Sequence, residues 1–121
     1  NHVLRVGYRA DAYTGLILRD LFPDWSEAGS LGFAVTSLST QPEYLILRVE
    51  DVLTMPGTHD RYEQVIELKP GQNEFSIPLY DITHSRLGRL LDTRRSKRIV
   101  LFSASEPRRD FSVEFDNFIL K

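Results

Sequence analysis

The chain has 121 residues, of which 41% are apolar and 26% are charged. This length and composition are typical of one globular domain with one hydrophobic core, and we expect residues 1–121 to form that domain. Fifteen Lys and Arg against 17 Asp and Glu leave a formal charge of −2, so no overall field would attract nucleic acid or an anionic membrane. The absence of cysteine excludes disulfides, CxxC redox motifs and thiolate zinc sites.

The sequence shows no apolar segment near the roughly 20 residues that a membrane-spanning helix needs. Its first residues include neither an initiator Met nor a signal-peptide pattern. We therefore expect the chain to be part of a longer protein, in which other segments carry any membrane anchor.

Short segments rich in Val, Ile, Leu, Phe and Tyr recur between turn residues along the chain. This spacing is typical of antiparallel β-domains and not of βαβ units. Eight strands are expected, at residues 2–8, 14–19, 30–38, 43–51, 61–68, 73–79, 97–103 and 111–120. The gaps between them hold proline turns at Pro42, Pro56-Gly57, Pro70-Gly71 and Pro107.

Alternation within two of these segments assigns their faces. In residues 43–51, the apolar side chains of Leu45, Leu47 and Val49 point one way, while Arg48 and Glu50 point the other way. One-sided strands of this kind predict an all-β fold, a two-layer antiparallel β-sandwich.

The second alternating segment is 73–79. Its predicted core side is made of Asn73, Phe75, Ile77 and Leu79. The intervening residues are expected to face outward or toward a groove; they are Glu74, Ser76 and Tyr80.

Little of the chain favours helix. Asp24 is placed to cap a single turn that Gly29 ends, and we expect Trp25, the only tryptophan, to close one end of the core. Residues 85–91 are interrupted by Gly88 and are expected to form a covering loop with about one helical turn.

The motifs of several enzyme classes are absent. The sequence has no GxSxG elbow, no GxxxxGK loop and no GxGxxG loop, and its three histidines are scattered. A glycosidase would need two carboxyl groups roughly 5 to 10 Å apart in a cleft. The acidic residues instead fall mostly where an outward strand face meets water, so we expect no catalytic residues.

The densest polar cluster is His59-Asp60-Arg61. One hypothesis makes Asp51, His59 and Asp60 metal ligands. The alternative is a solvated hairpin loop in which Arg61 pairs with Asp51. A basic stretch also follows at residues 86–98, but it lacks interleaved aromatics, and a solvated edge is the favoured interpretation.

Aromatic residues beside polar ones indicate a sugar-binding function. A rigid sugar site uses an aromatic face for the apolar side of a pyranose ring and polar side chains for the hydroxyls. Tyr44, Arg48 and Glu50 share the outward face of one strand. The next strand contributes either Tyr62 with Gln64 or Arg61 with Glu63. The candidate ligand-binding residues are therefore Tyr44, Arg48, Glu50, Arg61 and Tyr62.

A series of short motifs extends along nearly the whole chain. The first half carries Tyr13-Thr14-Gly15-Leu16, Asp24-Trp25-Ser26, Leu45 to Asp51 and Asp60-Arg61-Tyr62. The second half carries Leu68 to Asn73, Ile77 to Ile82, Arg89 to Asp92, Ile99 to Phe102 and Phe115 to Leu120. In this order they resemble galactose-binding-like jelly-roll domains, as found in VanZ-like bacterial membrane proteins, with CIA30-type domains and family 11 carbohydrate-binding modules as broader relatives.

The resemblance implies a non-catalytic module that holds a glycan in a shallow groove or at the loop ends. It also implies a hairpin set by the Pro70-Gly71 turn and Asn73. Kinship with the VanZ-like proteins implies an extracytoplasmic position, periplasmic or at the cell surface, with a membrane tether outside this chain. Kinship with assembly-factor domains implies the alternative function, a protein-interaction domain that uses the same sandwich face.

The resemblance further implies a role for Asp116. Its position in many such jelly rolls helps to hold a structural calcium ion, which takes roughly six to eight oxygen ligands. The alternative for Asp116-Asn117 is a β-bulge, because Phe115 and Phe118 break the strict alternation there.

Overall fold

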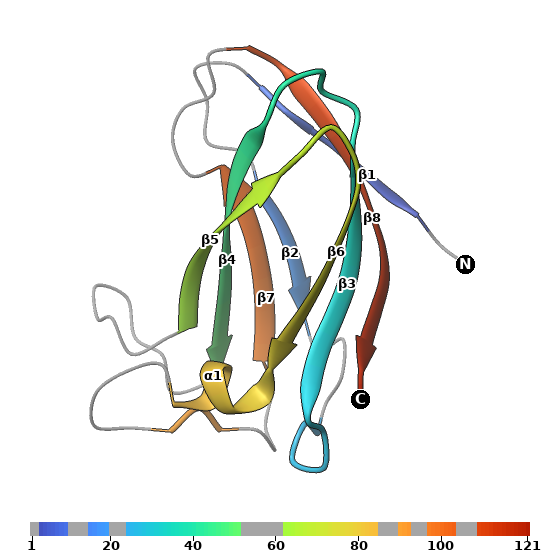
Figure 1. Cartoon of the computed structure of the whole chain (residues 1–121). Coiled ribbons are helices and arrows are strands. Elements are labelled where there is room, and N and C mark those ends of the chain that lie inside the picture. The colour runs from blue at the N-terminus through green and yellow to red at the C-terminus, as the bar shows by residue number, and fades with distance from the viewer. Residues whose placement is uncertain are drawn as a thin grey trace.

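The computed structural model describes residues 3–9, 15–19, 24–51, 62–84, 90–92, 97–103 and 109–121. Two antiparallel sheets of four strands each form the layers of a sandwich (Figure 1). The first sheet has the order β1-β8-β3-β6, with β1 at Leu4–Tyr8, β8 at Phe111–Leu120, β3 at Ser30–Ser37 and β6 at Gly71–Pro78. The second sheet has the order β2-β7-β4-β5, with β2 at Gly15–Arg19, β7 at Lys97–Ser103, β4 at Glu43–Asp51 and β5 at Tyr62–Leu68.

The predicted all-β sandwich is confirmed, and the described strands match the expected ones closely. The sixth strand differs, because it begins at Gly71 and ends at Pro78. After it, Leu79–Thr83 forms the short helix α1, where a continued strand was expected for Leu79. The reason is local, since Leu79 and Ile82 lie three residues apart and one helical turn buries both side chains against the core.

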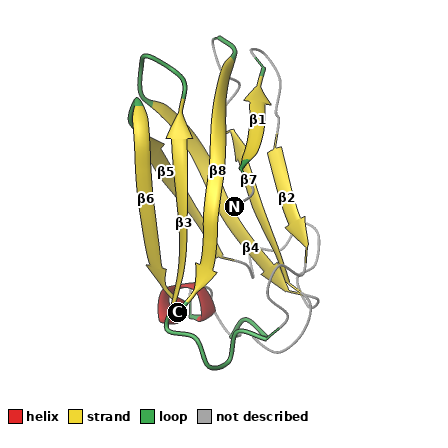
Figure 2. Ribbon diagram, turned by 90° about the vertical axis from the view of Figure 1, so that its right-hand side faces the viewer, coloured by secondary structure: helices red, strands yellow, loops and turns green. Residues whose placement is uncertain are grey.

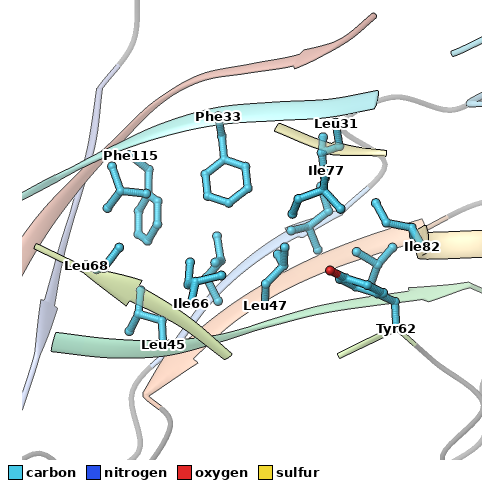
Figure 3. Packing of buried hydrophobic residues seen from close by; sticks show 14 of the residues in the cluster. Leu31, Phe33, Leu45, Leu47, Tyr62, Ile66, Leu68, Ile77, Ile82 and Phe115 are labelled. Atoms are coloured by element: carbon cyan, nitrogen blue, oxygen red, sulfur yellow. The ribbon is translucent and has the colours of Figure 1, made fainter. Parts of the chain in front are cut away.

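The core lies between the two sheets. Figure 3 shows Phe33 and Phe115 from the first sheet above Leu45 and Leu47 from the second. The predicted core face of β4 is confirmed, because Leu45, Leu47 and Val49 are fully buried.

Trp25 closes one end of this core, as predicted, and is only 2% exposed. The Asp24 carboxylate accepts a hydrogen bond of 2.8 Å from the backbone N–H of Ser26, so the expected capped turn is present. The ammonium group of Lys97 lies 5.4 Å from the centre of the Trp25 ring. At this distance the Lys97 cation makes a cation–π interaction with the Trp25 ring.

The turn that connects β5 of one sheet to β6 of the other is built around Gly71 and Asn73. Gly71 has a φ of +90°, a left-handed conformation that glycine adopts without strain. The Asn73 side chain accepts a hydrogen bond from the Lys69 N–H and donates to the carbonyls of Lys69 and Gly71 at 2.9 and 3.0 Å. These bonds satisfy the turn backbone, so the predicted turn is present. The predicted hairpin is wrong, because β5 pairs with β4 in one sheet and β6 pairs with β3 in the other, and the turn connects the two layers.

A β-bulge interrupts β8 where it pairs with β3. The register shifts between Gly32 and Ala34, and Asn117 has a φ of +57°. The Asp116 carboxylate accepts a 2.7 Å hydrogen bond from the Asn117 N–H. Asn is among the few residues that adopt this conformation at low cost, and the bulge expected at Asp116-Asn117 is confirmed.

Several predictions concern residues outside the described ranges. They are Arg61, the cluster His59-Asp60, residues 85–89 of the loop expected at 85–91, the basic residues Arg86, Arg89, Arg94 and Arg95, and the turns at Pro56-Gly57 and Pro107.

Candidate functional site

The outer face of the β2-β7-β4-β5 sheet brings the sequence-predicted residues of β4 together. Alternation along β4 places Tyr44, Ile46, Arg48 and Glu50 on this face, away from the buried Leu47. The expected outward direction of Arg48 is therefore confirmed. Glu50 is on the same face by alternation, but it is only 7% exposed and is paired with Arg98. Tyr44 is 51% exposed, so one aromatic ring is open to a ligand.

Antiparallel pairing aligns further side chains beside this strand. Ile46 lies between Val65 of β5 and Phe102 of β7, and Arg48 lies between Glu63 and Val100. Gly15 of β2 pairs with Phe102 on its other side. Because glycine has no side chain, that flank of the Phe102 ring is not covered by β2.

Arg48 is held in place by two neighbours. Its Nε donates a 2.8 Å hydrogen bond to the Glu63 carboxylate. Its guanidinium group lies 4.7 Å from the centre of the Phe102 ring, within the range of a cation–π interaction. The guanidinium is thus fixed over an aromatic surface. Only its Nε–H has a hydrogen-bond partner among the described residues, so its other N–H groups are donors for a ligand.

Two further contacts involve the glutamates of this face. Arg98 Nε donates a 2.7 Å hydrogen bond to the Glu50 carboxylate. The Tyr44 hydroxyl lies 3.4 Å from the Glu67 carboxylate. With Arg19, which pairs in register with Arg98, the described face carries three arginines and three glutamates, so its formal charge balances.

Tyr62 is a correction to the sequence-based prediction. Its ring is 5% exposed and points into the core (Figure 3), so it is not a residue of the outer face. Burial, together with the nearby Asp81 carboxylate, raises the pKa of the Tyr62 hydroxyl, which hydrogen-bonds to the Gln64 side chain. The two alternatives for β5 were Tyr62 with Gln64 and Arg61 with Glu63. Glu63 lies on the outer face, beside Arg48.

Phe102 is a candidate residue that the sequence analysis missed. A signal was present, because Arg98, Val100 and Phe102 alternate with the apolar residues Ile99 and Leu101. Only the pairing of β7 with β4 shows that Phe102 lies beside the residues of β4.

The described residues around Asp116 do not fit a calcium site. Across the described ranges, no group of three or more His, Asp or Glu side chains could hold a metal ion. Asp116 itself pairs in register with Ala34 and binds the Asn117 N–H. We therefore derive no role for calcium from this carboxylate.

A hollow of about 290 Å³ lies on the opposite sheet, over β3, β6 and β8. It is lined in part by Glu74 and Ser76, two residues for which an outward or groove-facing position was predicted. The sequence did not indicate the hollow itself, because it forms at the β8 bulge.

In the described part of the chain, no helix is long and apolar enough to cross a bilayer.

No protein-family model and no curated protein matches the sequence. Among solved structures, the chain is similar to part of an agarase, AgWH50C, with a TM-score of 0.75 and 17% identity over 98% of this chain. The chain spans only 22% of that agarase.

Two separate binding modules are also similar. One is the family 11 carbohydrate-binding module from Clostridium thermocellum, solved in complex with a β-1,3-1,4-mixed-linked tetrasaccharide, with a TM-score of 0.64, 14% identity and coverage of 99% of this chain and 84% of that one. The other is the family 30 module of the Clostridium thermocellum cellulase Cel9D-Cel44B, with a TM-score of 0.67, 15% identity and coverage of 98% and 73%. The chain therefore has the β-sandwich fold found in carbohydrate-binding modules.

Proposed function

We propose that this chain is a non-catalytic carbohydrate-binding module, and that the outer face of β2-β7-β4-β5 holds an uncharged glycan. The observation that carries this proposal is the exposed Tyr44 ring on the same strand face as the Arg48–Phe102 stack. The fold shared with the family 11 and family 30 modules supports it.

The chemistry of the face suits a sugar chain. Tyr44 offers aromatic surface to the C–H side of a pyranose ring. The Arg48 guanidinium, stacked on Phe102, offers donors to the hydroxyls, and Glu63 offers acceptors. Because ion pairs already hold Arg48 and Glu50, binding immobilises few side chains, which lowers its entropic cost.

The balanced charge favours a neutral glycan over a sulfated or uronic polymer. An anionic chain would gain little from arginines whose carboxylate partners remain beside them. Affinity is expected to be weak, because an open strand face leaves water to compete for every hydroxyl. Arg61 remains a predicted ligand-binding residue.

The proposal is tested by binding to neutral and anionic polysaccharides, measured by affinity electrophoresis and calorimetry. Mixed-linked β-1,3-1,4-glucan and agarose are the first probes, because one similar structure is a complex with a mixed-linked tetrasaccharide and another is an agarase. We expect Tyr44→Ala to weaken binding by at least about tenfold. Tyr80→Ala is the matched control, since it removes a 68% exposed tyrosine from α1 and leaves the sheet face intact. Equal affinities for the two variants, or no binding across a broad glycan array, would contradict the proposal.

A protein-interaction function is the second candidate. The observation that favours it is an apolar strip across the four strands, which contains Val65, Ile46, Phe102, Val100 and Ile17. Exposed apolar surface of this kind marks protein interfaces as well as sugar sites. A blank glycan array combined with loss of a partner upon Val65→Glu substitution would favour this function, which the similarity to CIA30-type domains also implies.

We propose in addition that the module acts outside the cytoplasmic membrane, as the resemblance to VanZ-like proteins implies. There it would meet cell-envelope or environmental sugars. Protease accessibility of the full-length protein in intact cells tests this location, and protection of the module inside intact cells would refute it.

A further inference from the structure

The hollow on the outer face of the other sheet is separate from the face proposed above. It lies over β6, β3 and β8, the strands nearest the viewer in Figure 2. The residues that matter for its chemistry are Ala34, Glu74, Ser76, Asn117, Ile119 and Lys121. The β-sandwich core separates it from Tyr44 and Arg48.

The hollow exists because β3 carries small residues next to the β8 bulge. A Cβ atom added at Gly32 would lie 3.3 Å from the Ile119 side chain, so any side chain there would occupy the space beside Ile119. The bulge shifts the register between Gly32 and Ala34 and leaves Asn117 exposed in a left-handed conformation. Strand pairing places Ser76 opposite Gly32 and Glu74 opposite Ala34.

The polar side chains around the hollow are not engaged by the described part of the protein. In this part of the chain, the side chains of Glu74, Ser76 and Asn117 have no hydrogen bond or ion pair to a described residue; the Asn117 contact with the Asp116 carboxylate uses its backbone N–H. On the opposite sheet, by contrast, Arg48 and Glu50 are ion-paired. The rim of the hollow therefore has a carboxylate, a hydroxyl and an amide free for a ligand.

We propose that this hollow binds a single monosaccharide unit. A carboxylate accepts hydrogen bonds from hydroxyls, while the amide and the Ser76 hydroxyl both donate and accept, which matches the dual character of sugar hydroxyls. Ala34 and Ile119 provide apolar surface for the C–H groups of the ring. A volume of about 290 Å³ lies at the lower limit of about 300 Å³ for small-molecule pockets, so one ring is accommodated and a longer chain would extend into solvent.

The occupant is uncharged for an electrostatic reason. Glu74 and Lys121 both line the hollow, so their formal charges cancel and a phosphate, sulfate or carboxylate group would find no net positive charge there. The module would then have two sites on opposite sheets, one for a glycan chain and one for a single sugar. Two weak sites of this kind would let one module contact two chains, which raises its apparent affinity for a polymer.

Amide NMR spectra of the isotope-labelled chain provide the test. The probes are D-glucose, D-galactose, D-mannose, D-xylose and N-acetyl-D-glucosamine, each titrated to about 100 mM, because ligands of this size bind with dissociation constants on the order of millimolar. With at least one sugar we expect saturable shifts at Gly32, Ala34, Ser76 and Asn117. An absence of saturable shifts at these amides with all five sugars would overturn the proposal.

Variants assign the shifts to the hollow. Asn117→Gly removes the amide group yet keeps a residue that adopts the left-handed conformation, and Ser76→Trp fills the space from an exposed position. Both are expected to abolish the shifts, whereas the matched control Gln72→Ala, farther along the same face of β6, keeps them. The spectra themselves report whether each variant is folded.

The result also separates this site from the proposed glycan face. Tyr44→Ala is expected to leave the monosaccharide shifts unchanged. The monosaccharide site can therefore be refuted while polysaccharide binding persists, and the glycan face can be refuted while the monosaccharide shifts persist. Shifts that survive in Asn117→Gly and Ser76→Trp, or that disappear in Tyr44→Ala, would contradict a separate sugar site here.

Discussion

Tyr8 links the two sheets through a buried hydroxyl, and its replacement by phenylalanine yields a quantitative prediction. The side chain is fully buried, and the hydroxyl donates a 2.9 Å hydrogen bond to the Leu101 carbonyl. The bond joins β1 of one sheet to β7 of the other. The ring also stacks on Phe111, with centroids 5.0 Å apart. Tyr8→Phe keeps the ring and its stacking and removes only the hydroxyl.

At neutral pH the variant is expected to be less stable. A hydrogen bond inside a protein contributes a net free energy of unfolding of about 1 kcal/mol, because the unfolded chain makes the same bond with water. Tyr8→Phe should therefore lower the free energy of unfolding by about 1 kcal/mol at about pH 7.

At alkaline pH the difference is expected to reverse. Burial raises the pKa of Tyr8 well above its usual value near 10. As the pH rises, Tyr8 therefore ionises in the unfolded chain before it ionises in the folded protein. The contribution of Tyr8 to the free energy of unfolding is fully present below about pH 10. Above that pH it falls by about 1.4 kcal/mol per pH unit. Phenylalanine has no proton to lose. The two proteins should be equally stable near pH 10.7, and the variant should be the more stable one above about pH 11.

Urea unfolding followed by the fluorescence of Trp25 measures both quantities, because this single tryptophan is buried in the folded state. Tyr80→Phe is the control, since that ring is exposed and its hydroxyl meets water in both states. A stability difference between wild type and Tyr8→Phe that stays constant from about pH 7 to about pH 11 would refute the reasoning, because it would mean that Tyr8 ionises as easily in the folded protein.

Three further predictions follow from the same structure. Leu47→Ala, at a fully buried core position, should lower the free energy of unfolding by roughly 2–5 kcal/mol in urea titrations; a loss below about 1 kcal/mol would contradict the described core. Asn117→Val should cost about 1–2 kcal/mol because a β-branched residue resists a φ of +57°, whereas Asn117→Gly should be close to neutral, and equal costs would count against the bulge. Arg48→Ala loses a partly exposed ion pair with Glu63 and its stack on Phe102, so its stability should change by less than about 1 kcal/mol while glycan affinity falls at least about tenfold; unchanged affinity in calorimetry would remove Arg48 from the site.

Local patterns were sufficient to predict much of this fold. Strict alternation in β4 assigned Leu47 to the core and Arg48 to the outer face, because successive strand side chains point to opposite sides whatever the strand pairs with. The Pro70-Gly71 turn was equally predictable, since the φ of Gly71 and the Asn73 bonds to Lys69 and Gly71 involve nearby backbone. The further bond from Asn73 to the Val35 carbonyl depends on the pairing of β6 with β3. Trp25 followed from a capping residue beside it and from its large apolar surface.

Other features lay beyond local pattern. Polar and apolar residues are mixed in β5, and its periodicity did not decide between the sets containing Tyr62 and Glu63. The structure decides it, because Ile66 and Leu68 of that strand are buried and Tyr62 shares their side. The helix α1 was likewise missed, because its one turn is stabilised by burial of Ile82 and not by a capping side chain.

The sequence by itself thus determined the class of fold, the strand segments and the outward direction of Arg48. Only the tertiary structure decided which residues lie side by side, as when Phe102 comes to lie beneath Arg48 and Gly32 beside Ile119. The physical reason is that strand order and register are set by contacts between residues far apart along the chain, and those contacts depend on burying both sheets at once. Candidate binding surfaces on a sandwich span several strands, so they become visible only after that assembly is known.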